Sequence, residues 1–354
     1  MKKLFCIALA VLVLLSSVSV MAGAVKIEDG LDALKAQFKD GVGPKVGEYI
    51  IDYKYYSPVK GSESKKYPLV IWLHGMGDGS EKGAQVAKSE IALWASDEFQ
   101  ARFEPAGGAF VFAPRSLEED SIFWGDALLE PLMAAVNDFI SKNSANVDTT
   151  RIYMGGYSMG GKMTLETAVA FPEMFAAIFP ICPAWVPDKS AASLIADIPV
   201  WITSSTRDPL INYHFAATPT WKNIISTNAR PEACRFSTLT KVCYANGEKT
   251  PSSHHAWFAV NNDMFTVDNG AYHYMTTVNG AGEEVTLTHP EGMISWLSQF
   301  TSDYDGAPCT GMGNINGEIN TGTLFTFEPI CDFFRSILDK IFSVFGIDIF
   351  KVKI

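Results

Sequence analysis

Short apolar runs recur along the chain, and segments with a helical pattern separate them. The runs lie at residues 48–56, 67–73, 109–113, 151–154, 176–181 and 199–203. The clearest helical patterns lie at 126–142 and 159–171, and Pro172 ends the second. Strands that are apolar on both faces and alternate with helices are typical of a parallel sheet covered on both sides. The pattern predicts an α/β fold with a doubly wound, mostly parallel sheet, whose ligands gather at the carboxyl ends of the strands.

The first 24 residues have the pattern of a secretory signal peptide. Lys2 and Lys3 precede an unbroken apolar run at 4–15, and small residues follow up to Ala24. The run is short for a bilayer span, so a cleaved signal is favoured over a retained membrane anchor. Residues 1–24 therefore predict a secreted protein, extracellular or associated with the cell surface.

The composition changes again after a central domain at 25–302. Residues 303–328 are rich in glycine, asparagine and aspartate, which predicts a linker. In residues 329–354, apolar and polar positions fall on opposite faces of a helix that is too short and too charged to span a bilayer. Its apolar face needs a cover, and the central domain, a membrane surface and a protein partner remain open alternatives.

Charge and cysteine content narrow the class of protein. The formal charge is −11, which argues against nucleic acid as a partner. Apart from Cys6 of the signal segment, the cysteines are Cys182, Cys234, Cys243, Cys309 and Cys331. In an exported chain, Cys234 with Cys243 and Cys309 with Cys331 are candidate disulfides, and free buried thiols are the alternative. The chain lacks zinc-type spacing of histidine and cysteine.

Residues 156–160, with the sequence Gly-Tyr-Ser-Met-Gly, carry the first candidate chemistry. They lie between the predicted strand at 151–154 and the predicted helix at 159–171. A G-x-S-x-G in this context is a nucleophile elbow, in which the serine occupies a strained turn and the glycines avoid collisions. The pattern is short and can arise by chance, but its context favours Ser158 as a nucleophile.

A second glycine-rich turn at 74–79, with the sequence HGMGDG, directly follows the apolar run at 67–73. Backbone N–H groups in such a turn can point at a ligand, so Gly75 or Met76 is placed to supply one donor of an oxyanion hole and Met159 the other. The turn lacks the Lys-Ser/Thr ending of a phosphate loop. His74 precedes the serine along the chain, which favours a structural role over that of a base.

Acyl transfer by a serine needs a base and an acid that orients the base. Asp208 falls in the loop after the predicted strand at 199–203 and is the candidate acid, although a turn role beside Pro209 is the alternative. Asp188 and Asp197 do not lie at the end of a strand, so they are weaker candidates.

The candidate base is one of the doublet His254 and His255, in the loop after a strand-like segment at 237–244. His214 lies too few residues after the candidate acid. His289 precedes a proline and is expected to cap the last helix.

Together these motifs resemble the α/β-hydrolase superfamily, and more narrowly secreted bacterial carboxylesterases akin to feruloyl and acetylxylan esterases and polyhydroxybutyrate-depolymerase-like enzymes. The similarity runs from about residue 48 to residue 300. Members with His-x-x-Trp use the first histidine, which favours His254, and members with Gly-His-x-Trp would use the position of His255. This chain has Ser252 and Ser253 where many relatives carry glycines, so both histidines stay open.

The resemblance implies a serine ester hydrolase that works through an acyl-enzyme without a metal or organic cofactor. Its substrates would be feruloyl or acetyl esters of plant polysaccharide. Trp124, Trp185 and Trp257 could form aromatic walls for aryl or sugar groups, with core packing as the alternative. A prolyl-oligopeptidase-like peptidase uses the same residues and is a second hypothesis. A non-catalytic binding module would lack a triad member, and none is missing.

Overall fold

The computed structural model describes residues 27–88, 90–117, 123–267 and 272–307. The predicted signal peptide, the helix at 329–354 and most of the linker lie outside the described residues, so these predictions stay predictions. Within the described part of the chain, no helix combines the length and apolar character needed to cross a membrane.

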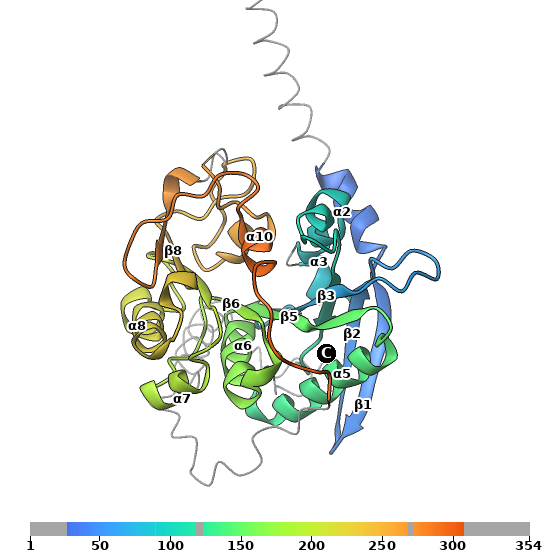
Figure 1. The fold of residues 1–354 in the computed structure, drawn as a ribbon. Helices are drawn as coiled ribbons and strands as arrows, with labels where there is room; N and C mark the ends of the chain where they lie inside the picture. Colours follow the sequence, from blue (N-terminus) through green and yellow to red (C-terminus); the bar gives the residue numbers. More distant parts are fainter. Residues whose placement is uncertain (1–26, 89, 118–122, 268–271, 308–354) are drawn as a thin grey trace, which may run out of the picture.

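One nine-stranded sheet organises the domain, in the order β1-β2-β4-β3-β5-β6-β7-β8-β9 (Figure 1). Strands β4, β3, β5, β6, β7 and β8 pair in parallel, and antiparallel pairs occur toward the edges, at β1-β2, β2-β4 and β8-β9. All side chains of β3 are buried. The predicted mostly parallel sheet is confirmed. The strands are β1 (Lys39–Val46), β2 (Tyr49–Tyr56), β3 (Tyr67–Leu73), β4 (Phe110–Pro114), β5 (Val147–Tyr157), β6 (Ala177–Ile181), β7 (Trp201–Ser205), β8 (Arg235–Leu239) and β9 (Met275–Asn279).

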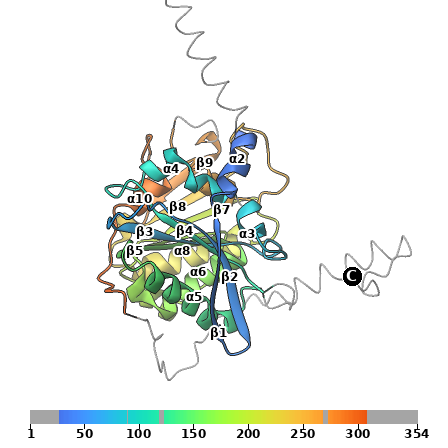
Figure 2. The same ribbon diagram turned by 90° about the vertical axis from the view of Figure 1, so that its right-hand side faces the viewer.

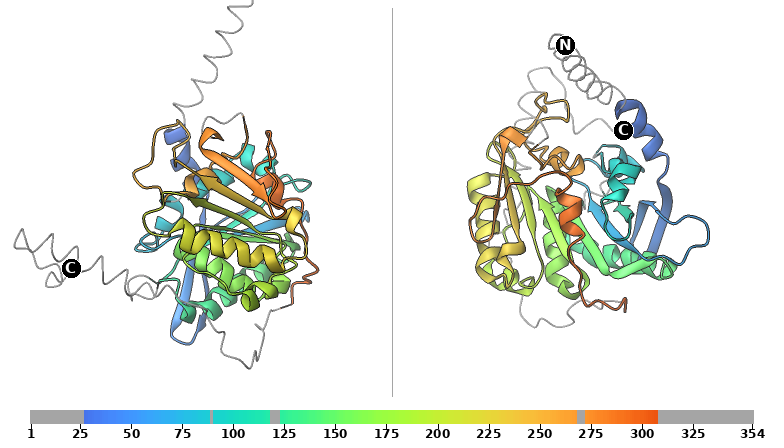
Figure 3. Two further views of the ribbon diagram at one scale, coloured as in Figure 1. Left: turned by 90° about the vertical axis from the view of Figure 1, so that its left-hand side faces the viewer. Right: turned by 45° about the horizontal axis from the view of Figure 1, so that its top comes forward.

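Helices cover both faces of the sheet and bury two hydrophobic cores. On one face α5 to α8 enclose a core that includes Phe139 and Leu165, and on the other α2, α3, α4, α9 and α10 cover a core that includes Trp94 and Trp296. Figure 2 and the left panel of Figure 3 show these layers from opposite sides of the molecule. The helices are α2 (Ile27–Lys35), α3 (Ala84–Ala87), α4 (Asp97–Ala101), α5 (Leu129–Lys142), α6 (Met159–Ala170), α7 (Lys189–Leu194), α8 (Thr218–Thr227), α9 (Trp257–Asn261) and α10 (Met293–Leu297).

The chain past the predicted domain boundary at residue 302 still packs on the domain. The Ser302 N–H donates to the carbonyl of Thr150, near the start of β5. Tyr304 is only 6 % exposed. The packed domain therefore extends beyond the predicted boundary.

Cys182, Cys234 and Cys243 are free and buried, which corrects the proposed pairing of Cys234 with Cys243. Cys234 directly precedes β8 and Cys243 follows it, so the length of that strand separates the two thiols. A five-residue strand spans about 17 Å, well beyond the reach of a disulfide. Cys309 and Cys331 lie outside the described residues.

Candidate active site

Ser158 occupies a strained turn between β5 and α6, at the carboxyl edge of the sheet. Its backbone angles are φ 57° and ψ −116°, a conformation that costs a residue with a side chain about 1–3 kcal/mol. The Ser158 N–H donates to the carbonyl of Ile181 at 2.9 Å, and the Ser158 carbonyl accepts from the Ala184 N–H at 3.1 Å. The turn is thus tied to the end of β6, and these bonds help to offset its strain.

The two glycines of the elbow have a steric cause. A Cβ atom at Gly156 would lie 2.4 Å from the Leu73 carbonyl oxygen, and one at Gly160 would lie 2.1 Å from the same atom. Because this oxygen belongs to the backbone of β3, neither contact can be relieved by a side-chain rotation. The elbow can approach the neighbouring strand only with glycine at both positions.

Asp208 lies in the loop that follows β7, and its two carboxylate oxygens form hydrogen bonds with different partners. Oδ1 accepts from the backbone N–H groups of Leu210 and Ile211 at 2.8 and 2.9 Å. Oδ2 lies 2.8 Å from Nδ1 of His254. The side chain is 1 % exposed, so the carboxylate is fixed in place and shielded from solvent.

His254 lies between this carboxylate and the elbow. Its ring centroid is 6.4 Å from that of Tyr157, the residue before Ser158. Burial alone would lower the pKa of His254, but interactions with Cys182 and Asp208 outweigh burial and raise this pKa above the ordinary 6.5. Burial also raises the pKa of the Cys182 thiol. The Asp208 carboxylate, 2.8 Å from Nδ1, is one of the groups that stabilise the protonated imidazole.

The ring of His255 lies among aromatic side chains. Its ring lies 6.0 Å from that of Trp257 and 6.2 Å from that of Phe258, and burial lowers its pKa. Of the two neighbouring histidines, it is His254 whose ring lies within hydrogen-bond distance of the Asp208 carboxylate, at 2.8 Å. The geometry therefore favours His254 over its neighbour.

The remaining candidate histidines lie away from this pair. His214 is exposed in a π-helical turn, Tyr213–Ala217. His289 is also exposed, and its Nε2 lies 3.3 Å from Arg102. The predicted capping role of His289 is wrong, because α10 begins later, at Met293, with Gly292 at its N-cap position.

His74 is completely buried and holds the glycine-rich turn in place. The Ser116 N–H donates to Nε2 of His74 at 3.0 Å, so the ring proton is on Nδ1, which donates to the Gly75 carbonyl at 2.6 Å. Burial lowers the pKa of His74 to about 4, so this ring stays neutral. These contacts agree with a structural role.

Two residues that the sequence did not signal connect the turn to the elbow. The hydroxyl of Tyr157 donates to the carboxylate of Asp78, and burial together with this carboxylate raises the pKa of Tyr157. The Tyr157 ring packs so closely on Gly75 that a Cβ there would lie 2.5 Å from it. The glycine-rich turn therefore lies beside the elbow, with Gly75 against Tyr157 and the His74 carbonyl close to Gly160.

The three tryptophans that were predicted to line the substrate site differ in their contacts and exposure. Trp124 has no exposed surface and donates its indole N–H to the His74 carbonyl at 2.8 Å, so it supports the turn and cannot contact a substrate. Trp185 and Trp257 are 4 % and 5 % exposed. Their indole N–H groups have no acceptor among the described residues. A substrate role for these two stays a prediction.

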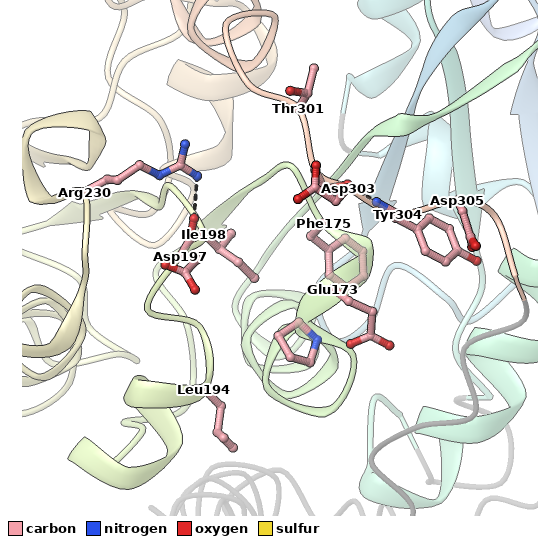
Figure 4. A pocket seen from close by; sticks show the side chains of 12 residues that line it. Glu173, Phe175, Leu194, Asp197, Ile198, Arg230, Thr301, Asp303, Tyr304 and Asp305 are labelled. Carbon is pink, nitrogen blue, oxygen red and sulfur yellow. Dashed lines mark hydrogen bonds between the residues drawn. The ribbon is translucent and has the colours of Figure 1, made fainter.

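A separate pocket of about 640 Å³ lies at the opposite end of the strands (Figure 4). Phe175 lies shortly before β6 and Ile198 shortly before β7, and Tyr304 of the C-terminal segment also lines the pocket. Asp197 lines this pocket, so its position is remote from the loop of Asp208. Asp188 is the N-cap of α7. Neither of the weaker acid candidates lies next to His254.

A mostly parallel sheet covered on both faces, with a strained serine elbow after β5, is the arrangement of the α/β-hydrolase fold. A family model described as Phospholipase/Carboxylesterase matches residues 126–243, which include the elbow and Asp208. The bifunctional acetylxylan esterase/xylanase XynS20E of Neocallimastix patriciarum is 23% identical over 266 residues, which cover 75% of this chain and 35% of that protein.

A solved structure of a thermostable esterase is 27% identical to this chain, with a TM-score of 0.53. The match covers 65% of this chain and 61% of that one. The chain thus spans about a third of the curated relative and less than two thirds of this structure. The matches confirm the resemblance to α/β-hydrolases and their esterases.

Proposed function

We propose that this chain is a serine carboxylesterase that hydrolyses its substrate through an acyl-enzyme. The observation that carries the proposal is the 2.8 Å contact between His254 and Asp208, at the edge of the sheet that also presents Ser158. The match to a carboxylesterase family model supports the same reaction class.

In the first step, the hydroxyl oxygen of Ser158 attacks the ester carbonyl while His254 takes its proton. The Nδ1–H of the neutral imidazole donates to Asp208, which leaves Nε2 unprotonated and able to act as the base. The Met159 N–H and a second N–H from Gly75 or Met76 are proposed to stabilise the tetrahedral oxyanion. The protonated imidazole then donates its proton to the departing alcohol.

In the second step, water attacks the acyl-enzyme with His254 again as the base, and the carboxylic acid leaves. The start of α6 at Met159 places the positive end of its helix dipole beside the developing oxyanion.

The raised pKa of His254 predicts a pH profile that is displaced toward alkaline conditions. Only the neutral imidazole can accept a proton, so kcat/KM should fall as the pH falls through the pKa of His254, and this acid limb should lie above pH 6.5. The Asp208→Asn variant replaces the carboxylate by a neutral amide, so the acid limb of its pH profile should move to lower pH. Its kcat should fall by about 10²- to 10⁴-fold. Rates with p-nitrophenyl acetate between pH 5 and about 10 measure both effects. A wild-type limb below pH 6.5, or an unmoved limb in the variant, would contradict this account.

We further propose that the substrates are acetyl or feruloyl esters of plant polysaccharide and that the protein is secreted. The Neocallimastix relative is a bifunctional acetylxylan esterase/xylanase, and its esterase activity supports the first proposal. The N-terminal pattern at 1–24 supports the second.

A panel of substrates tests the function. Wild-type protein is assayed on p-nitrophenyl acetate, methyl ferulate, acetylated xylan and a peptide p-nitroanilide, each beside Ser158→Ala. The proposal predicts turnover of the esters at least about 100-fold above that of the amide, and none with the variant. Preferential cleavage of the amide would instead identify a peptidase.

A further inference from the structure

Cys182 is a buried thiol that the proposed reaction does not use. It directly follows β6, with a φ of 33° and no exposed surface. Its N–H donates to the Thr203 carbonyl at 2.8 Å, and its thiol donates to the His254 carbonyl at 3.5 Å. The thiol is therefore held between the ends of β6 and β7, beside the loop that carries His254.

The position of this thiol creates a cluster of three different ligand types. The Cys182 sulfur, a carboxylate oxygen of Asp208 and a ring nitrogen of His254 all lie within 4.8 Å of one another. Cys182 and His254 are buried, and the side chain of Asp208 is 1 % exposed. Among the described residues, this is the one such group of three or more potential metal ligands.

We propose that Cys182, Asp208 and His254 form an inhibitory site for a borderline-soft divalent cation, with Zn²⁺ the best fit. The inhibition rests on the proposed esterase function, because a bound ion would occupy the imidazole that serves as the base. The binding itself does not depend on that function.

The ligand set and its spacing fit zinc. Thiolate, imidazole and carboxylate are all zinc ligands, whereas Ca²⁺ and Mg²⁺ prefer sets made only of oxygen. Two ligands of one tetrahedral zinc lie about 3.3–3.8 Å apart, given bond lengths of about 2.0–2.3 Å. The widest of the three separations must therefore close by at most about 1.5 Å, and the 2.8 Å contact between Nδ1 of His254 and Oδ2 of Asp208 must open by about 0.5 Å or more if Nδ1 binds the ion.

Coordination requires a change of protonation but no change of oxidation state. The metal replaces the thiol proton, which passes to solvent, and the ring nitrogen that binds the ion must be unprotonated. Water can fill the fourth position. The ion would also replace the hydrogen bond between His254 and Asp208, which orients the base.

Titration of hydrolysis with Zn²⁺ tests the proposal. The wild-type rate on p-nitrophenyl acetate should fall with added zinc and recover with a chelator. In Cys182→Ala and Cys182→Ser, the zinc concentration that halves each variant's own rate should rise at least about tenfold, because one of three ligands is lost or weakened. Cys234→Ala and Cys243→Ala also remove buried thiols and should match the wild type. Equal inhibition of all five proteins would overturn the proposal.

A binding measurement separates this inference from the proposed function. Co²⁺ is added to Ser158→Ala, which retains all three ligands, and thiolate-to-cobalt charge-transfer absorption is recorded in the near ultraviolet. The band should appear and should vanish in Ser158→Ala with Cys182→Ala, even if the chain proves not to be an esterase. Absence of the band, or its survival without Cys182, would overturn the site while leaving the esterase proposal intact.

Discussion

Ser158→Ala is expected to lower kcat for ester hydrolysis by about 10⁴-fold or more while the protein stays folded. The reason is that no other hydroxyl can replace an oxygen presented on the strained turn between β5 and α6. KM should change little, because the side chain is too small to contribute much to substrate binding. The measurement is steady-state hydrolysis of p-nitrophenyl acetate, with thermal unfolding to verify the fold.

Ser193→Ala is the control for this variant. Ser193 is exposed on α7, and its hydroxyl donates only to the local carbonyl of Ser190. Its removal should leave kcat within about twofold, as is usual for surface substitutions. Hydrolysis that survives Ser158→Ala at a comparable rate would remove Ser158 from the mechanism.

His254→Ala is expected to reduce kcat/KM by about 10⁴-fold or more, and His255→Ala by less than about tenfold. The two residues are adjacent and of the same type, so each is the matched control for the other. The difference arises because His254 contacts Asp208, whereas His255 lies against Trp257 and Phe258. The measurement is kcat/KM for p-nitrophenyl acetate, with circular dichroism to compare the folds. A larger loss in His255→Ala would reverse the assignment.

The elbow was predictable because its signal is local. Glycines on both sides of Ser158, a strand before it and a helix after it lie within one short segment, and the structure gives each glycine a steric reason. The choice between His254 and His255 was not predictable in this way. It depends on which ring faces Asp208, a contact across 46 positions of the chain.

The parts of the fold that the sequence did not signal lie at the edges of the sheet. β1 has the sequence KDGVGPKV, with glycine, proline and lysine that lack the apolar pattern of a buried strand. It pairs with β2 on one side only, so it needs no apolar pattern on both faces. The same reason applies to β9, which ends the opposite edge.

Side-chain direction explains the other differences. Trp124 was a plausible aromatic wall by residue type, but its ring faces the core and supports His74. Cys182 carried no motif, and only the folded sheet brings its thiol to Asp208 and His254. Residue type predicted the chemistry that each side chain can perform, whereas the tertiary contacts determined where it is performed.

The central claim is that His254 activates Ser158 for attack on an acyl group. A fluorophosphonate, which reacts with activated serine hydroxyls, tests it most directly, with peptide mapping by mass spectrometry. The account predicts one adduct per chain, on Ser158, formed at least about 100-fold more slowly in His254→Ala and at the wild-type rate in His255→Ala. An active enzyme that carries no adduct on Ser158, or that is labelled equally fast without His254, would contradict the account.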